Sequence, residues 1–363
     1  MTSTKLSADV NQFPSITWHH LHINHGHFEG KVEAEIEPSV SSVPDGIRFE
    51  RKNLSEAFGN EKHVQTQLGK AFDADIDEME NSLGIKVNEY TVEAGKKLND
   101  LVKISYKTFG GKFQASDTVI AAGEGSFSTF IFEYESEGEG EGVFGHRVRI
   151  HCAKNAVVRL VTVNLLGSSI VHYNGIGTDV DDGGRVELIQ IELGGKESFS
   201  GSYHNLFGYK ASCFVQGGYV AGGKSSLDIN YVAHQEGCGS DSYSNFNGVL
   251  MDDAKKTWRG SIDFERGAKE AKGDEQENVL LLSPDVVNKS MPVILCDEED
   301  VEGRHGGTVG KISEDELLYL ETRGINEATA RSMMIKSRIN SIVRYIPDAS
   351  IVEKIQSFLE ENL

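Results

Sequence analysis

The chain has 363 residues, of which 38% are hydrophobic and 25% are charged, and its formal net charge is −20 at pH 7. This balance argues against a function in binding DNA, RNA or anionic lipid, because such binding consists largely of phosphate neutralisation by Lys and Arg. No stretch approaches the roughly 18 consecutive apolar residues of a membrane-spanning helix, and the first residues carry no apolar secretion signal. We therefore expect a cytoplasmic protein whose partners are proteins or cations, with no nucleic acid and no membrane.

Residues 1–83 are expected to form an irregular N-terminal segment with one or two short helices between residues 53 and 82, where helix-forming residues are frequent. The segment contains a cluster of five histidines, His19, His20, His22, His25 and His27. Crowded imidazoles can bind zinc, copper or nickel, so this cluster is a candidate metal site. No carboxylate or thiolate lies between the histidines, however, and the alternative is that the cluster is adventitious.

Between residues 84 and 311 the sequence consists of short runs in which apolar and polar residues alternate, as in "LVKISYKT", "RVRIHCA" and "RVELIQIEL". A period of two is typical of β-strands, and the Gly, Asp, Asn and Ser residues between the runs are typical of turns. Because no fixed repeat length is visible, a sandwich, barrel, propeller or solenoid all remain open. The continuous supply of strands and the Gly-rich bends favour a β-helix over a closed sandwich.

Two features of this region could suggest a metal, disulfide or nucleotide site, but their spacing does not fit one. Four widely spaced cysteines include no C-x-x-C pair, which indicates free thiols rather than a zinc site or a disulfide framework. Gly306 to Lys311 resembles a phosphate-binding loop, but His305 and Ile312 stand where that motif requires Gly and Ser or Thr. We therefore expect no nucleotide site in this chain.

Residues 312–363 predict three short amphipathic helices. Ser313 to Glu316 has the pattern of a capping box, Asn326 is a cap for the second helix, and Asp348 starts the third after Pro347 has ended the second. Short amphipathic helices are marginal on their own, so these need a surface to cover.

The same C-terminal part contains, in order, Leu280-Leu281-Leu282-Ser283, Pro292 before an apolar run, Asp300-Val301, His305-Gly306, Gly310-Lys311-Ile312 and Leu317-x-Tyr319-Leu320-x-x-Arg323-Gly324-Ile325. In this pattern the chain resembles the SufB/SufD family, the scaffold subunits of the Suf iron–sulfur cluster assembly machinery, from about residue 45 to residue 360. The resemblance implies a mainly β fold, a right-handed parallel β-helix with a small N-terminal irregular and helical segment and a C-terminal helical segment.

The resemblance also implies a function. We expect a non-catalytic, SufD-like scaffold subunit that works with a SufC-type ATPase and pairs with a SufB-like or SufD-like chain as a homodimer or heterodimer. The ATPase would bind the C-terminal helices, where the candidate partner-binding residues are Leu317, Leu318, Tyr319, Arg323 and Met334. No tightly bound cofactor is expected, only a transient iron–sulfur cluster.

The candidate residues for cluster assembly follow from the same comparison. SufD-like chains usually carry Cys-Ser-His-Gly where this chain has Gly303-Arg304-His305-Gly306, so the thiol is missing and the histidine is kept. The functional cysteine of SufB-like chains falls near Glu277, and the nearest thiol is Cys296. His305 is therefore the main candidate, since imidazole can bind iron and carry protons; Cys296, Glu302 and Asp300 are weaker candidates. The alternative is that His305 only hydrogen-bonds its own loop.

Two other functions remain open at this point. A carbohydrate-active β-helix protein of the pectin lyase type would need paired carboxylates, or Lys or Arg, on one exposed ladder, and usually a secretion signal. A metal-buffering protein would use the histidine cluster.

Overall fold

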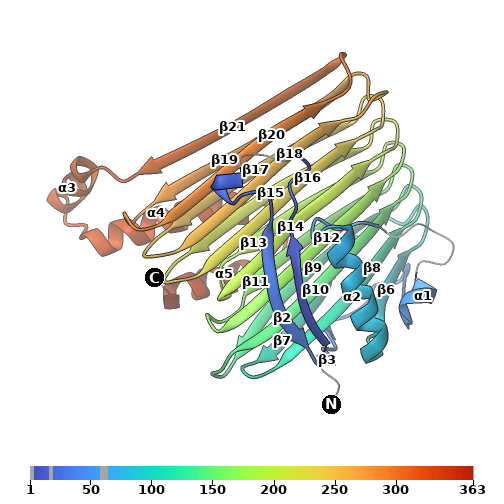
Figure 1. Ribbon diagram of the computed structural model, residues 1–363, viewed down its shortest axis with the longest axis horizontal. Helices are drawn as coiled ribbons and strands as arrows, with labels where there is room; N and C mark the ends of the chain where they lie inside the picture. The colour runs from blue at the N-terminus through green and yellow to red at the C-terminus, as the bar shows by residue number, and fades with distance from the viewer. Residues whose placement is uncertain (1–3, 16–18, 58–63, 363) are drawn as a thin grey trace.

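The computed structural model describes residues 4–15, 19–57 and 64–362, and in these residues the chain winds as a parallel β-helix (Figure 1). From β6 (Val87–Val92) onward, successive strands alternate between a ten-stranded and a nine-stranded sheet, and from β8 (Phe113–Ala122) onward each strand pairs with the strand two places before it. Helices lie near both ends of the chain. The predicted fold class is thus confirmed: the protein is mainly β, a parallel β-helix with terminal helices.

The ten-stranded sheet contains β6 (Val87–Val92), β8 (Phe113–Ala122), β10 (Gly142–Cys152), β12 (Ile170–Val180), β14 (Glu197–Leu206), β16 (Ser226–Gln235), β18 (Lys255–Phe264) and β20 (Val287–Cys296). The nine-stranded sheet contains β7 (Val102–Phe109), β9 (Phe127–Glu137), β11 (Val157–Leu165), β13 (Arg185–Glu192), β15 (Ser212–Ala221), β17 (Asp241–Leu250), β19 (Ala271–Leu281) and β21 (Val301–Lys311).

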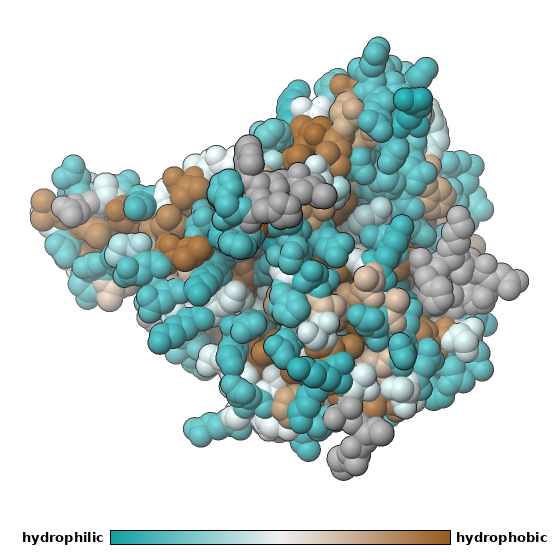
Figure 2. Space-filling model, viewed as in Figure 1, coloured by the Kyte–Doolittle hydropathy of each residue, from teal (hydrophilic) through white to brown (hydrophobic). Residues whose placement is uncertain are grey.

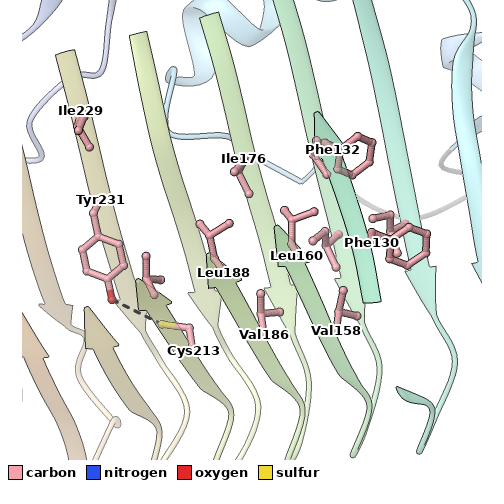
Figure 3. Close-up of a cluster of buried hydrophobic side chains, with 14 of the residues drawn as sticks. Phe130, Phe132, Val158, Leu160, Ile176, Val186, Leu188, Cys213, Ile229 and Tyr231 are labelled. Carbon is pink, nitrogen blue, oxygen red and sulfur yellow. Dashed lines mark hydrogen bonds between the residues drawn. The ribbon is translucent and has the colours of Figure 1, made fainter. Parts of the chain in front are cut away.

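The core lies between these two sheets, because alternate side chains of every strand point inward. Parallel register places equivalent residues of successive turns above one another, so that Phe130, Leu160, Leu188 and Val215 form one continuous apolar column. Figure 3 shows this interior from the β9 side to Tyr231, whose hydroxyl lies 3.6 Å from the Cys213 Sγ. Each turn between the two ends of the β-helix therefore buries its apolar residues against the turns on both sides of it.

One bend of the β-helix recurs once per turn at a regular spacing that is not apparent in the sequence. The residues there have a left-handed backbone and recur at intervals of about 30 residues, within the range of solenoid repeats; they are Gly95, Gly125, Asn155, Gly183, Lys210, Gly239 and Glu270. The amide of each donates to a carbonyl of the next turn, for example Lys210 to Cys238 at 2.9 Å. Glycine adopts this conformation most easily, but Lys210 and Glu270 also adopt it. No glycine spacing therefore reveals the repeat.

The N-terminal segment contains more strand than its sequence indicates. Instead of an irregular leader, β1 (Thr4–Val10) and β2 (Gly26–Val32) form an antiparallel pair, and three short strands join the two large sheets: β3 (Ala34–Glu35), β4 (Ser39–Val40) and β5 (Ile47–Lys52). Each strand of the pair has one exposed, polar face, so its apolar residues are few and widely spaced. Those residues pack with α2 (Lys70–Leu83) on the outer face of the ten-stranded sheet. Two more short elements are η1 (His19–Leu21) and α1 (Leu54–Ala57).

The helix α2 is also fixed to the sheet by a buried ion-pair network. The guanidinium of Arg147 lies 2.7 Å from carboxylate oxygens of Asp77, Glu80 and Asp117, and Arg149 also pairs with Asp117. Two cations thus stand among these three carboxylates, so their charges are largely compensated.

The C-terminal helices are α3 (Glu314–Thr322), α4 (Glu327–Val343) and α5 (Ala349–Asn362). The buried faces of α4 and α5, which include Ile335, Ile339 and Ile355, pack against outward-facing residues of the nine-stranded sheet. The surface that these two amphipathic helices require is therefore the β-helix itself. In contrast, α3 projects from the end of the molecule (Figure 1). Of the helices that the structure describes, none is both long and apolar enough to cross a membrane.

Candidate functional site

His305 lies on the last strand of the nine-stranded sheet, β21, which pairs with β19 and has no described strand on its other side. It stands directly beside Glu275 of β19. Neighbouring residues in a parallel ladder point to the same face, and Glu275 points inward, so His305 also points to the inner side of the β-helix. The imidazole is nevertheless exposed, because the described chain adds no further turn over it. At the terminal turn, therefore, a side chain that points to the inner side of the β-helix is exposed to solvent.

Glu275 is a buried carboxyl group beneath this open turn. Its Oε1 accepts a hydrogen bond from the amide of Val293 on β20 at 3.0 Å, and its Oε2 has no partner among the described residues. Burial raises the pKa of Glu275 well above its usual range. Next to the exposed imidazole of His305, the strand therefore holds a carboxyl group that favours its protonated form.

A buried ion pair lies one inward position further along β19. The ammonium group of Lys256 donates to Glu277, whose Oε1 also accepts from the Tyr219 hydroxyl at 2.7 Å. Lys256 also donates to the Ser290 hydroxyl at 3.0 Å, which connects the pair to the terminal turn. Burial lowers the pKa of Lys256, and Glu277 opposes that change. The end of the core thus contains a buried ion pair in addition to its apolar residues.

The other candidates for cluster assembly lie apart from His305. Glu302 is beside Lys272, with 3.0 Å between Lys272 Nζ and a Glu302 oxygen, and both side chains point outward. Cys296 is the exposed last residue of β20, and its thiol donates to the carbonyl of Glu298 at 3.0 Å. The carbonyl of Asp300 accepts from the Glu270 amide. Among the described residues, no set of three convergent metal-ligating groups contains any of these four candidates.

Sequence reasoning singled out Glu277 only as a position where a family cysteine is missing, and it missed Glu275 and Lys256. In sequence, the run Glu275-Gln276-Glu277 has the appearance of a solvated strand face. The only signal is the period of two, since Ala271, Gly273 and Val279 share the inward face with both glutamates. A carboxylate in phase with core residues is a candidate for a buried site.

The Gly306 to Lys311 stretch lies within β21, and α3 begins after the cap Ser313. The Ser313 hydroxyl accepts from the Glu316 amide at 3.1 Å, and the Ser313 amide donates to the Glu316 carboxylate at 3.1 Å. The capping box thus engages the amides of Ser313 and Glu316, and the Gly306 to Lys311 stretch is part of a β-strand and not of a phosphate-binding loop.

The candidate partner-binding residues divide into two groups. Leu318 and Tyr319 on α3 are each 59% exposed, Leu317 is half-buried, and the guanidinium of Arg323 lies over the Tyr319 ring at 5.4 Å. Met334 instead packs against the core beneath α4. Its neighbour Met333, which the sequence did not single out, is 53% exposed. Figure 2 shows hydrophobic residues on the projecting end of the molecule that contains α3.

The side chain of His19 lies outside the described part of the structure, and of the other four N-terminal histidines only His25 and His27 share a partner. The Nδ1 atoms of His25 and His27 lie 3.3 and 3.0 Å from the same oxygen of Asp9, whereas His20 and His22 are exposed at the turn before them. Among the described residues, no set of three convergent metal-ligating groups includes a histidine of this cluster. Lys289 of β20 donates to the carbonyl of Leu21 at 2.8 Å, so the turn lies beside the last strand of the ten-stranded sheet.

Comparison with known families agrees with this architecture. A sequence model described as "SUF system FeS cluster assembly, SufBD core domain" matches residues 105–338, which is more than half of the chain. The chain belongs to the SufBD family. The matched region begins in β7 and ends in α4, so it contains the terminal turn with His305 and all of α3.

Named SufBD relatives are similar at low identity. The iron–sulfur cluster assembly protein SufD of Bacillus subtilis is 25% identical over 210 residues, which cover 58% of this chain and 48% of the relative. SufD of Plasmodium berghei is 24% identical over 216 residues, covering 57% of this chain and 15% of the relative. A SufBD family protein of Pyrococcus horikoshii is 31% identical over 127 residues, covering 35% of this chain and 28% of the relative. These matches span about half or less of the relatives' own lengths, and they do not favour the pectin lyase alternative.

Proposed function

We propose that this chain is a non-catalytic scaffold subunit of a cytoplasmic Suf-type iron–sulfur cluster assembly complex and that it works with a SufC-type ATPase. The observation that carries the proposal is α3, an exposed helix that carries Leu318 and Tyr319 on its surface and lies inside the part of the chain that matches the SufBD family. The other two C-terminal helices bury their apolar faces against the β-helix, whereas α3 has no buried residue among those described. A helix with exposed Leu318 and Tyr319 fits a groove on another protein.

The second part of the proposal concerns the terminal turn. Both β20 and β21 end their sheets, and an unpaired strand edge is a template for pairing with another chain. A second SufB-like or SufD-like chain, or another copy of this one, would cover this edge and enclose His305. The nascent cluster is then transient cargo at the interface, with His305 as an iron ligand or proton carrier and Glu275 as a proton carrier beneath it. The chain itself needs no tightly bound cofactor.

Co-purification with the SufC-type ATPase from the same genome tests the first part. We expect a stable complex with the wild-type chain and none with the double variant Leu318→Glu/Tyr319→Glu. Phe207→Glu is the matched control, since it also places a charge at an exposed aromatic position, on the turn after β14. Equal recovery of the ATPase with the double variant, or no recovery with the wild-type chain, would overturn the proposal.

Native mass spectrometry tests the second part. Val309 of β21 is 55% exposed and lies on the face that a pairing chain would cover. We expect Val309→Glu to abolish dimers of the chain, or its heterodimer with a SufB-like partner, while the thermal unfolding of the monomer stays unchanged. Dimers that persist in this variant would place the interface elsewhere.

A further inference from the structure

A group of acidic residues surrounds one histidine on the outer face of the ten-stranded sheet, on β16 and on β18, the strand next to the edge strand β20. His234 on β16 and Asp263 on β18 are direct neighbours in the parallel ladder. Glu236 and Glu265 each follow two residues later, where the two strands end. Parallel strands lie about 4.8 Å apart, so the register of the β-helix brings together donors that are about one turn apart in sequence.

The donor atoms of this group converge. His234 Nδ1 lies 2.8 Å from an oxygen of Asp263, and His234 Nε2 lies 3.4 Å from an oxygen of Glu236. One ligand atom each from His234, Asp263 and Glu265 lies within 4.8 Å of the other two. The side chains of His234 and Asp263 are only 19% and 21% exposed, and the Tyr203 ring stacks on the imidazole at 6.0 Å. The group therefore forms a partly buried cluster of metal-ligating side chains beside an aromatic ring.

No described Lys or Arg compensates the negative charge of this cluster. Among the described residues, no Lys or Arg forms an ion pair with Glu236, Asp263 or Glu265, and Glu265 makes no side-chain hydrogen bond. The second convergent group of carboxylates in the described chain, that of Asp77, is filled by two arginine guanidinium groups. Three carboxylates around one imidazole thus lack the cations that their counterparts beneath α2 possess.

We infer that His234, Asp263 and Glu265, flanked by Glu236, bind one divalent first-row transition-metal ion. An imidazole nitrogen combined with carboxylate oxygens suits Zn²⁺, Mn²⁺ or Fe²⁺. Metal–ligand distances of about 2.0–2.2 Å are reached by small rotations of side chains that already lie together. The ion joins two neighbouring turns of the β-helix on its outer face. This site is separate from His305 and does not depend on the proposed function.

Mn²⁺ is the probe, because carboxylate-rich sites bind it well, whereas thiolate or histidine clusters prefer ions such as Cu²⁺ or Zn²⁺. MnCl₂ is titrated into the full chain in 150 mM NaCl, and free Mn²⁺ is followed by its electron paramagnetic resonance signal. We expect one tight equivalent in the wild-type chain. The loss even of outer partners of metal ligands weakens binding by about 10–100-fold, so His234→Gln, Asp263→Asn and Glu265→Gln are each expected to weaken it at least about tenfold.

Asp9→Asn is the matched control, since Asp9 is the carboxylate of the other half-exposed histidine–carboxylate group, with His25 and His27. It is expected to keep the tight equivalent. Glu265→Gln guards against a folding artefact, because no described hydrogen bond or ion pair depends on that side chain. A saturating Mn²⁺ concentration should also raise the midpoint of thermal unfolding of the wild-type chain more than that of Glu265→Gln. Absence of a stoichiometric equivalent, or the same affinity in wild type and all three variants, would overturn the inference.

Discussion

The interior of the β-helix contains a histidine that should make the fold sensitive to acid. His146 on β10 is fully buried, with Nδ1 2.8 Å from the Tyr134 hydroxyl and Nε2 3.0 Å from the Thr118 hydroxyl. Burial lowers its pKa to about 3. In an unfolded chain the pKa of histidine is about 6.5. Between these two values the unfolded chain binds a proton that the folded chain does not, so a falling pH favours unfolding.

The size of the effect follows from linkage. Above pH 6.5 the contribution of His146 to stability is fully present, and it is lost as the pH falls from 6.5 toward 3. One pKa unit corresponds to about 1.36 kcal/mol, so between pH 7 and pH 5 the free energy of unfolding should fall by about 2 kcal/mol through this residue. Other buried histidines and carboxyl groups also titrate, but their contributions cancel when two variants are compared at the same pH.

Urea unfolding of the wild-type chain and His146→Gln at pH 7 and pH 5, followed by far-ultraviolet circular dichroism, measures this difference. Glutamine offers a donor and an acceptor but does not titrate. We expect the wild-type chain to lose about 2 kcal/mol more than His146→Gln between the two pH values. His20→Gln, at an exposed position, is the control and should retain the wild-type pH dependence. If His146→Gln also retains it, burial does not hold the imidazole neutral and the reasoning is refuted.

Three further predictions concern packing, the buried ion pair and the terminal turn. Ile339→Ala, which opens a cavity under α4, should lower the free energy of unfolding by about 2–5 kcal/mol in urea titrations, whereas Leu318→Ala on α3 should change it by less than about 0.5 kcal/mol. Lys256→Met leaves Glu277 buried without its cation and should lower the free energy of unfolding by about 3–5 kcal/mol. Adding Glu277→Leu should restore most of this stability, because no buried charge then lacks a partner. A double variant that is as unstable as Lys256→Met would contradict the pairing of the two charges. His305→Ala should leave the midpoint of thermal unfolding unchanged but lower the amount of cluster formed in the assembled complex. Cluster formation at the wild-type level would contradict a role of His305 in cluster assembly.

The β architecture and the C-terminal helices could be predicted from the sequence because they depend on local patterns. Alternation at a period of two marks each strand, and the capping residues Ser313 and Asn326 mark two helix starts, both of which the structure confirms. The repeat length could not be read, because Lys210 and Glu270 take the left-handed conformation that glycine takes elsewhere. Hydrogen bonds between turns hold these positions in the left-handed conformation, so residues other than glycine can occupy them. The spacing of glycines therefore does not mark the repeat.

The polar groups of the interior were the hardest features to predict. Glu275 and Glu277 are acidic residues in a polar strand, and apart from their phase with Ala271, Gly273 and Val279 only their partners on other turns show that they are buried. The group at His234 and Asp263 depends on a ladder register that the sequence does not display. Sequence reasoning found His305 through family resemblance, since a lone histidine in a Gly-rich strand has no periodic signal of its own. Groups that become neighbours only by stacking of turns require the structure.

Reconstitution of cluster assembly tests the central claim most directly. The chain, the SufC-type ATPase and a SufB-like partner from the same genome are combined without oxygen with iron, a sulfur source and ATP, and transfer of cluster to an acceptor apoprotein is followed by its visible absorption. The account predicts that cluster transfer requires this chain and that Leu318→Glu/Tyr319→Glu reduces transfer to the level found without it, while Phe207→Glu does not. Transfer at the full rate with the double variant, or without the chain, would contradict the account.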